Sequence, residues 1–257
     1  MVGKIQAQAN DVPVNQWQFA MSFGYGSIET PIANHQNLDI YILPNISYYG
    51  ERFFIDNTTL GYALYEQGPW FVDVVGKLNE DGLYFKFDNV GALAAVGLDF
   101  GRGWSGFDIA SVERDVSYLA GIAVNYETPL IQTSVRFYQD ISSVHNGSEL
   151  EVSAAKYVNI ADWLLTGEVS ITHKSHELLS YYYQLARNES VMMIGTYTPL
   201  HSGTNINAKF VADYRLTEQL SFSFSYRQTW LTDEITNSPI VDTDSIAMFF
   251  SGVTYTF

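Results

Sequence analysis

The chain of 257 residues contains no cysteine, few charged residues and no long apolar run. Without cysteine, thiol catalysis, disulfide bonds and cysteine-based metal sites are excluded. Charged residues make up 16% of the chain, below the usual value of about 25%, and the acidic ones outnumber the basic ones by 28 to 13. The resulting net charge of −15 argues against nucleic acid as a partner, because phosphates need cationic side chains. The nearest approach to a long apolar run, residues 90–97, is far shorter than the roughly 18 residues of a transmembrane helix.

Aromatic residues are abundant, at 15% of the chain, and many of them alternate with polar residues. In residues 219–230, Leu220, Phe222 and Phe224 alternate with serines. The same period of two occurs in residues 16–25, 69–78, 116–126, 131–138, 163–174, 205–215 and 252–257. A period of two predicts β-strands with one apolar and one polar face. Each segment has about ten residues, which is enough to cross a bilayer at a tilt.

The polar faces carry charged residues in the middle of strands, which distinguishes a membrane barrel from a soluble β-sandwich. The core of a sandwich has no place for such charges, whereas a wet barrel lumen does. Aromatic residues near strand ends, such as Trp17, Trp70 and Trp163, are typical of the girdles at the two membrane interfaces. We therefore predict an all-β transmembrane antiparallel up-and-down β-barrel. Its lumen is expected to be lined by Asp73, Lys77, Asp99, Arg136, Glu168, Lys174, Lys209, Asp213, Arg215 and Arg227.

The connections alternate between short turns and long polar loops. Short turns belong on the periplasmic side of such barrels, together with both chain ends, so the number of strands is even. We expect twelve strands, with fourteen as the alternative, because residues 37–56 fit one strand bent at Pro44 or two strands broken there. Residues 16–257 form the barrel and residues 1–15 a flexible N-terminal tail. The segment 175–190 is the only one in which a helical turn is expected.

Several segments in order resemble one family. They are Leu43 to Asn57, Leu60 to Tyr62, Tyr181 to Tyr183, Tyr214 to Thr217, Asn237 to Val241 and Gly252 to Phe257. Together they resemble the MipA/OmpV outer-membrane proteins over residues 16–257. The resemblance implies the outer membrane of Gram-negative bacteria. In one branch of that family it implies a scaffold that links a murein-degrading lytic transglycosylase to a murein-synthesising penicillin-binding protein; other branches are associated with adhesion, osmotic response or antibiotic susceptibility. No member is established as an enzyme.

Two groups of residues have both a functional and a structural interpretation. Val253, Tyr255 and Phe257 resemble the C-terminal signal read by the barrel assembly machinery, and they would equally serve as lipid-facing side chains. The lumenal charges could line a narrow pore or form a salt-bridged filling, because buried charges need partners. Filling is the stronger interpretation, since a twelve-stranded barrel is only just wide enough for a channel.

Metal binding and catalysis are weaker possibilities. The acidic loop positions around Glu80 and Asp81, 233–234 and 242–244 could bind calcium, but a solvated face is the stronger interpretation. His173 with Ser175 could form a nucleophile–base pair, although no nucleophile motif supports it. We expect no enzyme activity, no cofactor and no metal.

The expected function is that of a structural or scaffolding barrel, which would contact periplasmic murein enzymes through its short turns and its N-terminal tail. Its other expected partners are outer-membrane lipid, lipopolysaccharide and the barrel assembly machinery. Two alternatives stay open. One is a narrow channel for small solutes, and the other is a surface adhesin that acts through the long loops 175–202 and 231–244.

Overall fold

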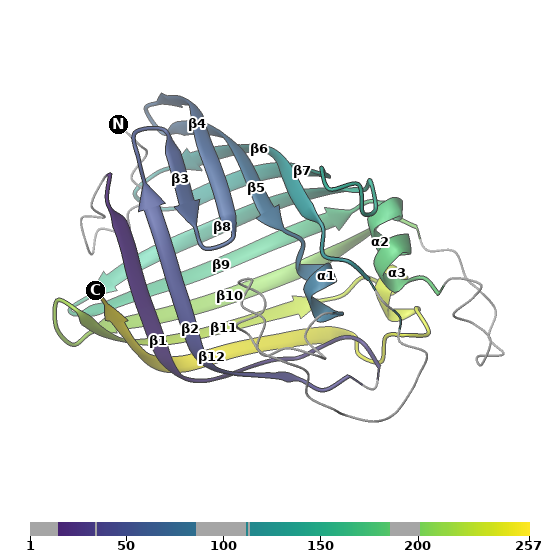
Figure 1. Cartoon of the computed structure of the whole chain (residues 1–257). Coiled ribbons are helices and arrows are strands. Elements are labelled where there is room, and N and C mark those ends of the chain that lie inside the picture. Colours follow the sequence, from purple (N-terminus) through teal and green to yellow (C-terminus); the bar gives the residue numbers. More distant parts are fainter. Residues whose placement is uncertain (1–14, 34, 86–111, 113, 186–200) are drawn as a thin grey trace.

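The computed structural model describes residues 15–33, 35–85, 112, 114–185 and 201–257. Within these residues, twelve antiparallel strands form a closed barrel in which each strand pairs with its sequence neighbours and β1 pairs with β12 (Figure 1). The strands are β1 (Trp17–Ile28), β2 (Leu38–Tyr49), β3 (Phe53–Asp56), β4 (Thr59–Gln67), β5 (Trp70–Leu78), β6 (Tyr118–Glu127), β7 (Gln132–Asp140), β8 (Ser148–Ile160), β9 (Trp163–Lys174), β10 (Gly203–Arg215), β11 (Leu220–Trp230) and β12 (Ser245–Thr256). The predicted barrel of twelve strands is thus confirmed.

The two ends of the barrel differ. One end, here called the turn end, holds the short turns 50–52, 68–69, 128–131, 161–162 and 216–219 together with the C-terminus. The opposite end, called the loop end, holds the described parts of the long connections (Figure 1). Among the described residues these include three short helices, α1 (Glu80–Tyr84), α2 (His176–Tyr183) and α3 (Asp233–Thr236). None of the helices in the described ranges has the length and apolar character needed to span a bilayer.

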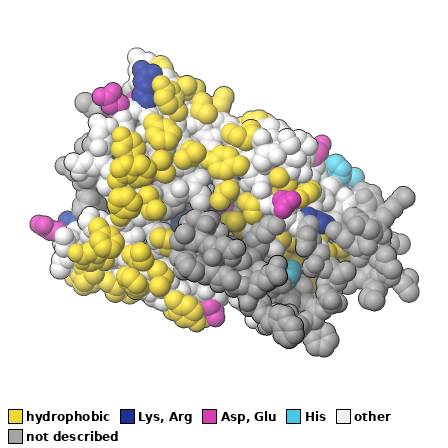
Figure 2. Space-filling model, viewed as in Figure 1, with side chains coloured by type: hydrophobic (Ala, Val, Ile, Leu, Met, Phe, Trp, Pro, Cys, Tyr) yellow, Lys and Arg dark blue, Asp and Glu magenta, His cyan; other side chains and the backbone are white. Residues whose placement is uncertain are grey.

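The barrel wall is apolar outside and polar inside. Large apolar side chains point outward in the middle of strands and are exposed. The exposed fraction is 59% for Val169 and 50% for Ile122. Figure 2 shows hydrophobic side chains spread over the outer wall with few charges among them. On the inner face, serine hydroxyls of neighbouring strands bond directly, as Ser134 Oγ and Ser153 Oγ do at 2.7 Å. This distribution of apolar and polar side chains is the reverse of that in a soluble protein, and it suits a wall surrounded by lipid.

Three cross-strand Trp–Tyr pairs mark the turn end on the outer wall. They join Trp17 to Tyr48, Trp70 to Tyr126 and Trp163 to Tyr214, with ring centroids 5.1, 4.6 and 4.9 Å apart. The residues of each pair lie directly opposite one another on neighbouring strands. Amphipathic rings favour the headgroup level of a bilayer, so these pairs form a girdle at that depth.

Residues 37–56 form two strands, but the break lies at residues 50–52 and not at Pro44. Pro44 sits inside β2 opposite Met21 of β1. On its other side, β2 pairs with β3 only through Ser47–Tyr49, so among the described residues Pro44 has a strand neighbour on one side only. Proline is tolerated in such an edge-like position because its missing N–H then removes no ladder bond.

The hairpin of β3 and β4 is much shorter than the others. Its turn residue Asn57 adopts a positive φ of 52°. The Asn57 N–H donates to the Ile46 carbonyl oxygen at 2.9 Å, and the Asn57 Oδ1 accepts from the Ile46 N–H at 3.1 Å. The hairpin therefore ends against the middle of β2 and leaves the half of β2 toward the loop end without a strand partner on that side, as far as the described residues go.

Helices occur in more segments than the sequence predicts, and some predicted positions lie outside the described residues. The prediction that only residues 175–190 would contain helix is wrong, because α1 and α3 lie elsewhere. The lumenal position predicted for Asp99 and most of the predicted N-terminal tail lie outside the described residues.

Candidate functional site

A cavity of about 340 Å³ occupies the lumen below the helices of the loop end. Its wall contains more carboxylates than cations. The charged side chains that line it are Asp56, Asp73, Glu80, Asp81, Glu149, Glu151 and Glu168, with Lys77, Arg136, Lys174 and Arg227. Six of the residues predicted for the lumen are in this set.

The other predicted lumen residues lie elsewhere. Lys209 borders a smaller cavity of about 290 Å³ that it shares with Arg227 and Glu80. Asp213 and Arg215 line a third cavity of about 430 Å³ at the turn end, next to the turns 161–162 and 216–219. The structure therefore brings six of the predicted residues together around the central cavity and places Lys209, Asp213 and Arg215 elsewhere along the barrel.

Each cation of the central cavity is paired with a carboxylate. Lys77 pairs with Glu149 and Arg136 with Glu151, both across the inner wall. The Lys174 Nζ lies 2.6 Å from the Asp81 carboxylate, and the Arg227 guanidinium lies 2.9 Å from that of Glu80. The carboxylates of Asp56, Asp73 and Glu168 form no ion pair with another described residue. The cavity thus carries a formal excess of negative charge.

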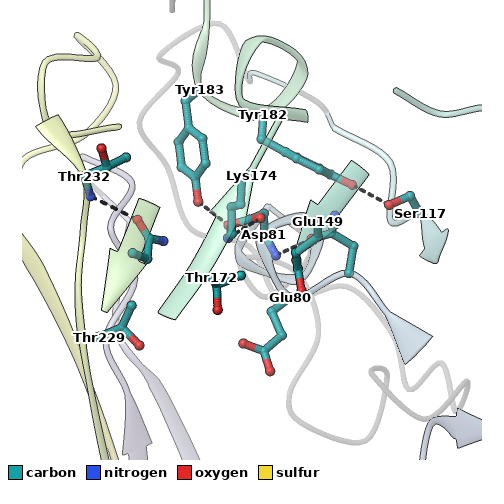
Figure 3. A network of polar contacts seen from close by, with 12 residues as sticks. Glu80, Asp81, Ser117, Glu149, Thr172, Lys174, Tyr182, Tyr183, Thr229 and Thr232 are labelled. Carbon is teal, nitrogen blue, oxygen red and sulfur yellow. Dashed lines mark hydrogen bonds and ion pairs between the residues drawn. The ribbon is translucent and has the colours of Figure 1, made fainter. Parts of the chain in front are cut away.

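Two of these ion pairs tie α1 to the wall. The Asn79 side chain caps the helix by accepting the Asp81 N–H at 2.8 Å, which starts α1 with its acidic residues directed into the lumen. Lys174 of β9 donates to both carboxylate oxygens of Asp81 at 2.7 and 2.6 Å, and the Tyr183 hydroxyl donates to the same carboxylate at 2.6 Å (Figure 3). Glu80 and Asp81 therefore form ion pairs inside the barrel.

Helix α2 lies at the loop end of the barrel and packs against the connections there. Four of its side chains, Leu178, Leu179, Tyr182 and Tyr183, have no exposed surface. They pack in one hydrophobic cluster with residues from the other long connections, namely Ile32, Phe85, Ile235, Ile240 and Val241. Each buried side chain of this size contributes about 1.5–3 kcal/mol. We call α1, α2 and this cluster the plug.

The plug keeps its polar groups in defined protonation states. Burial, with Asp81 close by, raises the pKa of the Tyr183 hydroxyl well above its usual value, so the hydroxyl remains a donor. Burial also raises the pKa of Glu80, but the charges of Arg227 and Lys77 outweigh it and lower that pKa to about 2. The Glu80 side chain is 54% accessible, yet it borders two lumen cavities, so this access is to the lumen.

The sequence comparison decides the family. Residues 19–257 match the model of the family described as MltA-interacting protein MipA. The chain belongs to the MipA family. The resemblance inferred from the order of segments is therefore confirmed, and this MipA-family chain is an outer-membrane β-barrel.

Its similarity to individual relatives is low but spans most of the chain. The MltA-interacting protein of Escherichia coli (strain K12) is 24% identical over 258 residues, which cover 100% of this chain and 97% of that protein. The outer membrane protein Omp26La of Vibrio anguillarum is 21% identical over 230 residues, covering 89% of this chain and 82% of that protein. A solved outer membrane channel from Pseudomonas putida F1 is 8% identical, with a TM-score of 0.42 over 98% of this chain and 99% of that one.

The sequence-based prediction did not place Asp56, Glu149 or Glu151 in the lumen of this MipA-family barrel. Glu149 and Glu151 lie on β8, in a segment whose polar residues alternate with Leu150 and Val152. The period of two that identified the other strands is present there and would have placed both glutamates on the inner face. Asp56 was harder to find, because β3 has only four residues and shows no alternation.

The C-terminal strand of the MipA-family barrel is fully paired. Tyr255 lies opposite Met21 of β1 and Leu220 of β11. Val253 and Tyr255 are exposed at 37% and 38%, and Phe257 at 75%. In the closed barrel these side chains are thus available to lipid or to another protein, while the backbone edges of β12 are not.

Proposed function

We propose that this chain is a structural barrel of the outer membrane whose turn end and both chain ends face the periplasm. The loop end would then face the cell exterior and the lipopolysaccharide layer. The division into short turns at one end and long connections at the other supports this orientation, because barrels of this class place short turns in the periplasm. In this role the barrel needs neither catalysis nor a cofactor.

The plug at the loop end is the feature that supports the proposed structural role. The plug buries four side chains of α2 completely, and every cation of the central cavity is paired with a carboxylate. We infer from this packing and pairing that the lumen is not an open path and that the barrel acts through its outer surfaces.

The partner proposed for the turn end is a periplasmic murein enzyme of the MltA type. The relative from Escherichia coli is named for its interaction with MltA. Only the turn end would face the murein in the proposed orientation. The turn after β6 presents the apolar side chain of Leu130, which is 74% exposed. The carboxylates of Glu127 and Glu66 lie nearby, at the ends of β6 and β4. An apolar contact with an acidic surround suits a partner with a basic surface.

The binding of purified MltA to the barrel in lipid vesicles tests this proposal. Leu130→Asp removes the apolar contact and adds a charge, and we expect it to weaken binding at least about tenfold, the equivalent of losing one buried leucine. The matched control is Ile141→Asp, which changes an exposed apolar residue, at 62%, at the loop end. Loss of binding in Ile141→Asp with no loss in Leu130→Asp would mean that the contact lies at the loop end and would contradict the proposal. If the unaltered chain does not bind MltA, MltA is not its partner.

A second candidate function is a narrow cation-preferring channel. The observation in its favour is the central cavity of about 340 Å³, in which Asp56, Asp73 and Glu168 form no ion pair with another described residue. Conductance in a planar bilayer separates the two functions. A structural barrel gives no steady current, whereas a channel gives discrete steps with cation selectivity.

A further inference from the structure

One buried histidine joins both plug helices to the barrel wall. His145 lies in the connection 141–147 between β7 and β8, and its side chain has no exposed surface. Its Nε2 lies 2.9 Å from the Ser117 Oγ and 3.4 Å from the Asn79 Nδ2. Its Nδ1 accepts the Gly147 N–H at 2.8 Å. Every polar atom of the ring is therefore engaged.

The contacts with Gly147 and Ser117 require a neutral ring with its proton on Nε2. The Asn79 Nδ2 is itself a donor, so at 3.4 Å it is a packing neighbour of the ring and not a hydrogen-bond partner. A backbone N–H can only donate, so the bond from Gly147 needs a free electron pair on Nδ1. The proton on Nε2 is then directed to the Ser117 Oγ. In a protonated histidine both nitrogens carry hydrogen, and Nδ1 would present a donor to the donor of Gly147.

The neighbours of His145 belong to the plug. Gly147 lies against the first turn of α2 so closely that a Cβ atom added to it would be 2.6 Å from the Leu178 backbone nitrogen. The Tyr182 hydroxyl of α2 lies 3.2 Å from the same Ser117 Oγ that His145 contacts (Figure 3 shows this pair). Asn79 is the N-cap of α1. A change at the imidazole therefore reaches both helices through direct contacts.

The groups around His145 act on its protonation in opposite directions. Burial disfavours the charged ring, whereas the carboxylates of Asp140, Asp81 and Glu177 favour it, and burial wins, so the pKa of His145 is lowered. Its other neighbours are aromatic. The rings of Tyr181 and Tyr182 have centroids 6.2 and 5.6 Å from the imidazole, and the Arg114 guanidinium lies over the Tyr181 ring.

The sign of the resulting pH dependence follows from the lowered pKa. When the plug is released, His145 reaches water and regains its usual pKa of about 6.5. Below that value the released state binds more protons than the closed one, so acidification favours release. Above it the ring is neutral in both states, and the plug keeps its full stability.

We propose that His145 is a pH-sensitive latch, in which protonation of Nδ1 breaks the bond from Gly147 and releases α1 and α2 from the wall in mildly acidic medium. The consequence is a loop end that is closed at neutral pH and opens toward the lumen cavity on acidification. This regulation does not depend on any partner at the turn end.

A buried cysteine in the plug measures its opening, because the chain has no cysteine of its own. In Leu179→Cys, a polar maleimide added outside lipid vesicles reacts only when α2 leaves the cluster. The ratio of reaction rates between about pH 5.0 and about pH 7.5 is compared between chains with His145 and with His145→Asn. The asparagine Oδ1 still accepts the Gly147 N–H but cannot be protonated in this range. Since both chains are measured at the same pH values, the chemistry of the reagent cancels.

We expect acidification to accelerate labelling of the His145 chain relative to the His145→Asn chain by up to about 30-fold, the limit set by a pKa of about 6.5 in the released state. The control is His173→Asn on the outer wall, where Nδ1 contacts the Thr204 Oγ1 at 2.9 Å, and it should retain the full response. A relative acceleration of about twofold or less would overturn the latch. If Leu179→Cys does not give a heat-modifiable, folded barrel, Leu178→Cys in the same cluster provides the same comparison.

Discussion

Removing the Lys174 ammonium should leave a buried carboxylate without its cation. In Lys174→Met, the Asp81 carboxylate loses two hydrogen bonds of 2.7 and 2.6 Å and retains the one from the Tyr183 hydroxyl. The Asp81 side chain is only 3% exposed. Breaking a buried ion pair on one side costs about 3–5 kcal/mol, and we take the lower end, about 3 kcal/mol, because the cavity beside Asp81 admits water.

This penalty should fall on the plug and not on the barrel wall, because Asp81 belongs to α1. A change of about 3 kcal/mol corresponds to roughly a 100-fold larger fraction of open plug. Maleimide labelling of Leu179→Cys at neutral pH measures that fraction directly. The matched control is Lys209→Met, which removes another lumenal lysine that forms no ion pair with a described residue.

The double variant Lys174→Met with Asp81→Asn tests whether the effect comes from the unpaired Asp81 carboxylate or from the loss of the lysine side chain itself. The amide carries no charge, so most of the penalty should disappear and labelling should return to within about tenfold of the unaltered chain. If the double variant labels as fast as Lys174→Met, the uncompensated carboxylate is not the cause. If neither variant differs from the unaltered chain, the ion pair does not hold the plug.

Two further predictions concern the wall and its assembly. Gly121→Ala should prevent closure of the barrel, because the added Cβ would lie 1.7 Å from the Phe137 carbonyl oxygen. In the control Gly167→Ala the added Cβ meets no atom within 4 Å, so this variant should fold normally. The heat-modifiable fraction of each variant on a gel compares the two. Phe257→Ala should slow insertion by the barrel assembly machinery in proteoliposomes while leaving the unfolding midpoint nearly unchanged, because Phe257 is 75% exposed and packs little in the closed barrel. A lowered midpoint with normal insertion would make Phe257 a purely structural residue.

The alternation of residues predicted the wall well for a physical reason. Every strand of a membrane barrel separates lipid from a wet lumen, so each contributes the same apolar–polar period. Leu220, Phe222 and Phe224 follow this period, and they lie in a regular strand with no bulge. Lumen-facing Arg136 and Lys174 could be placed from the same period.

The partners of those charges could not be predicted in the same way. Lys174 pairs with Asp81, 93 residues away in the sequence, because α1 folds back into the barrel. That helix has only five residues, too few for a helical period to be visible, and its acidic start resembles any polar loop. The plug thus depends on how connections fold over the mouth, which no local pattern encodes.

The short hairpin of β3 and β4 sets where the wall is weakest under lateral tension. β1 and β12, which close the barrel, are in register at nine positions, whereas β2 and β3 are in register at three. Separating neighbouring strands breaks their ladder bonds, so a seam with fewer pairs yields first. Among the described strands, the seam with the fewest paired positions therefore lies between β2 and β3, and not between β1 and β12. A neighbouring molecule that pulls on the wall in the plane of the membrane would part it there, beside Asn57 and Ile46, while the closure between β1 and β12 stayed intact.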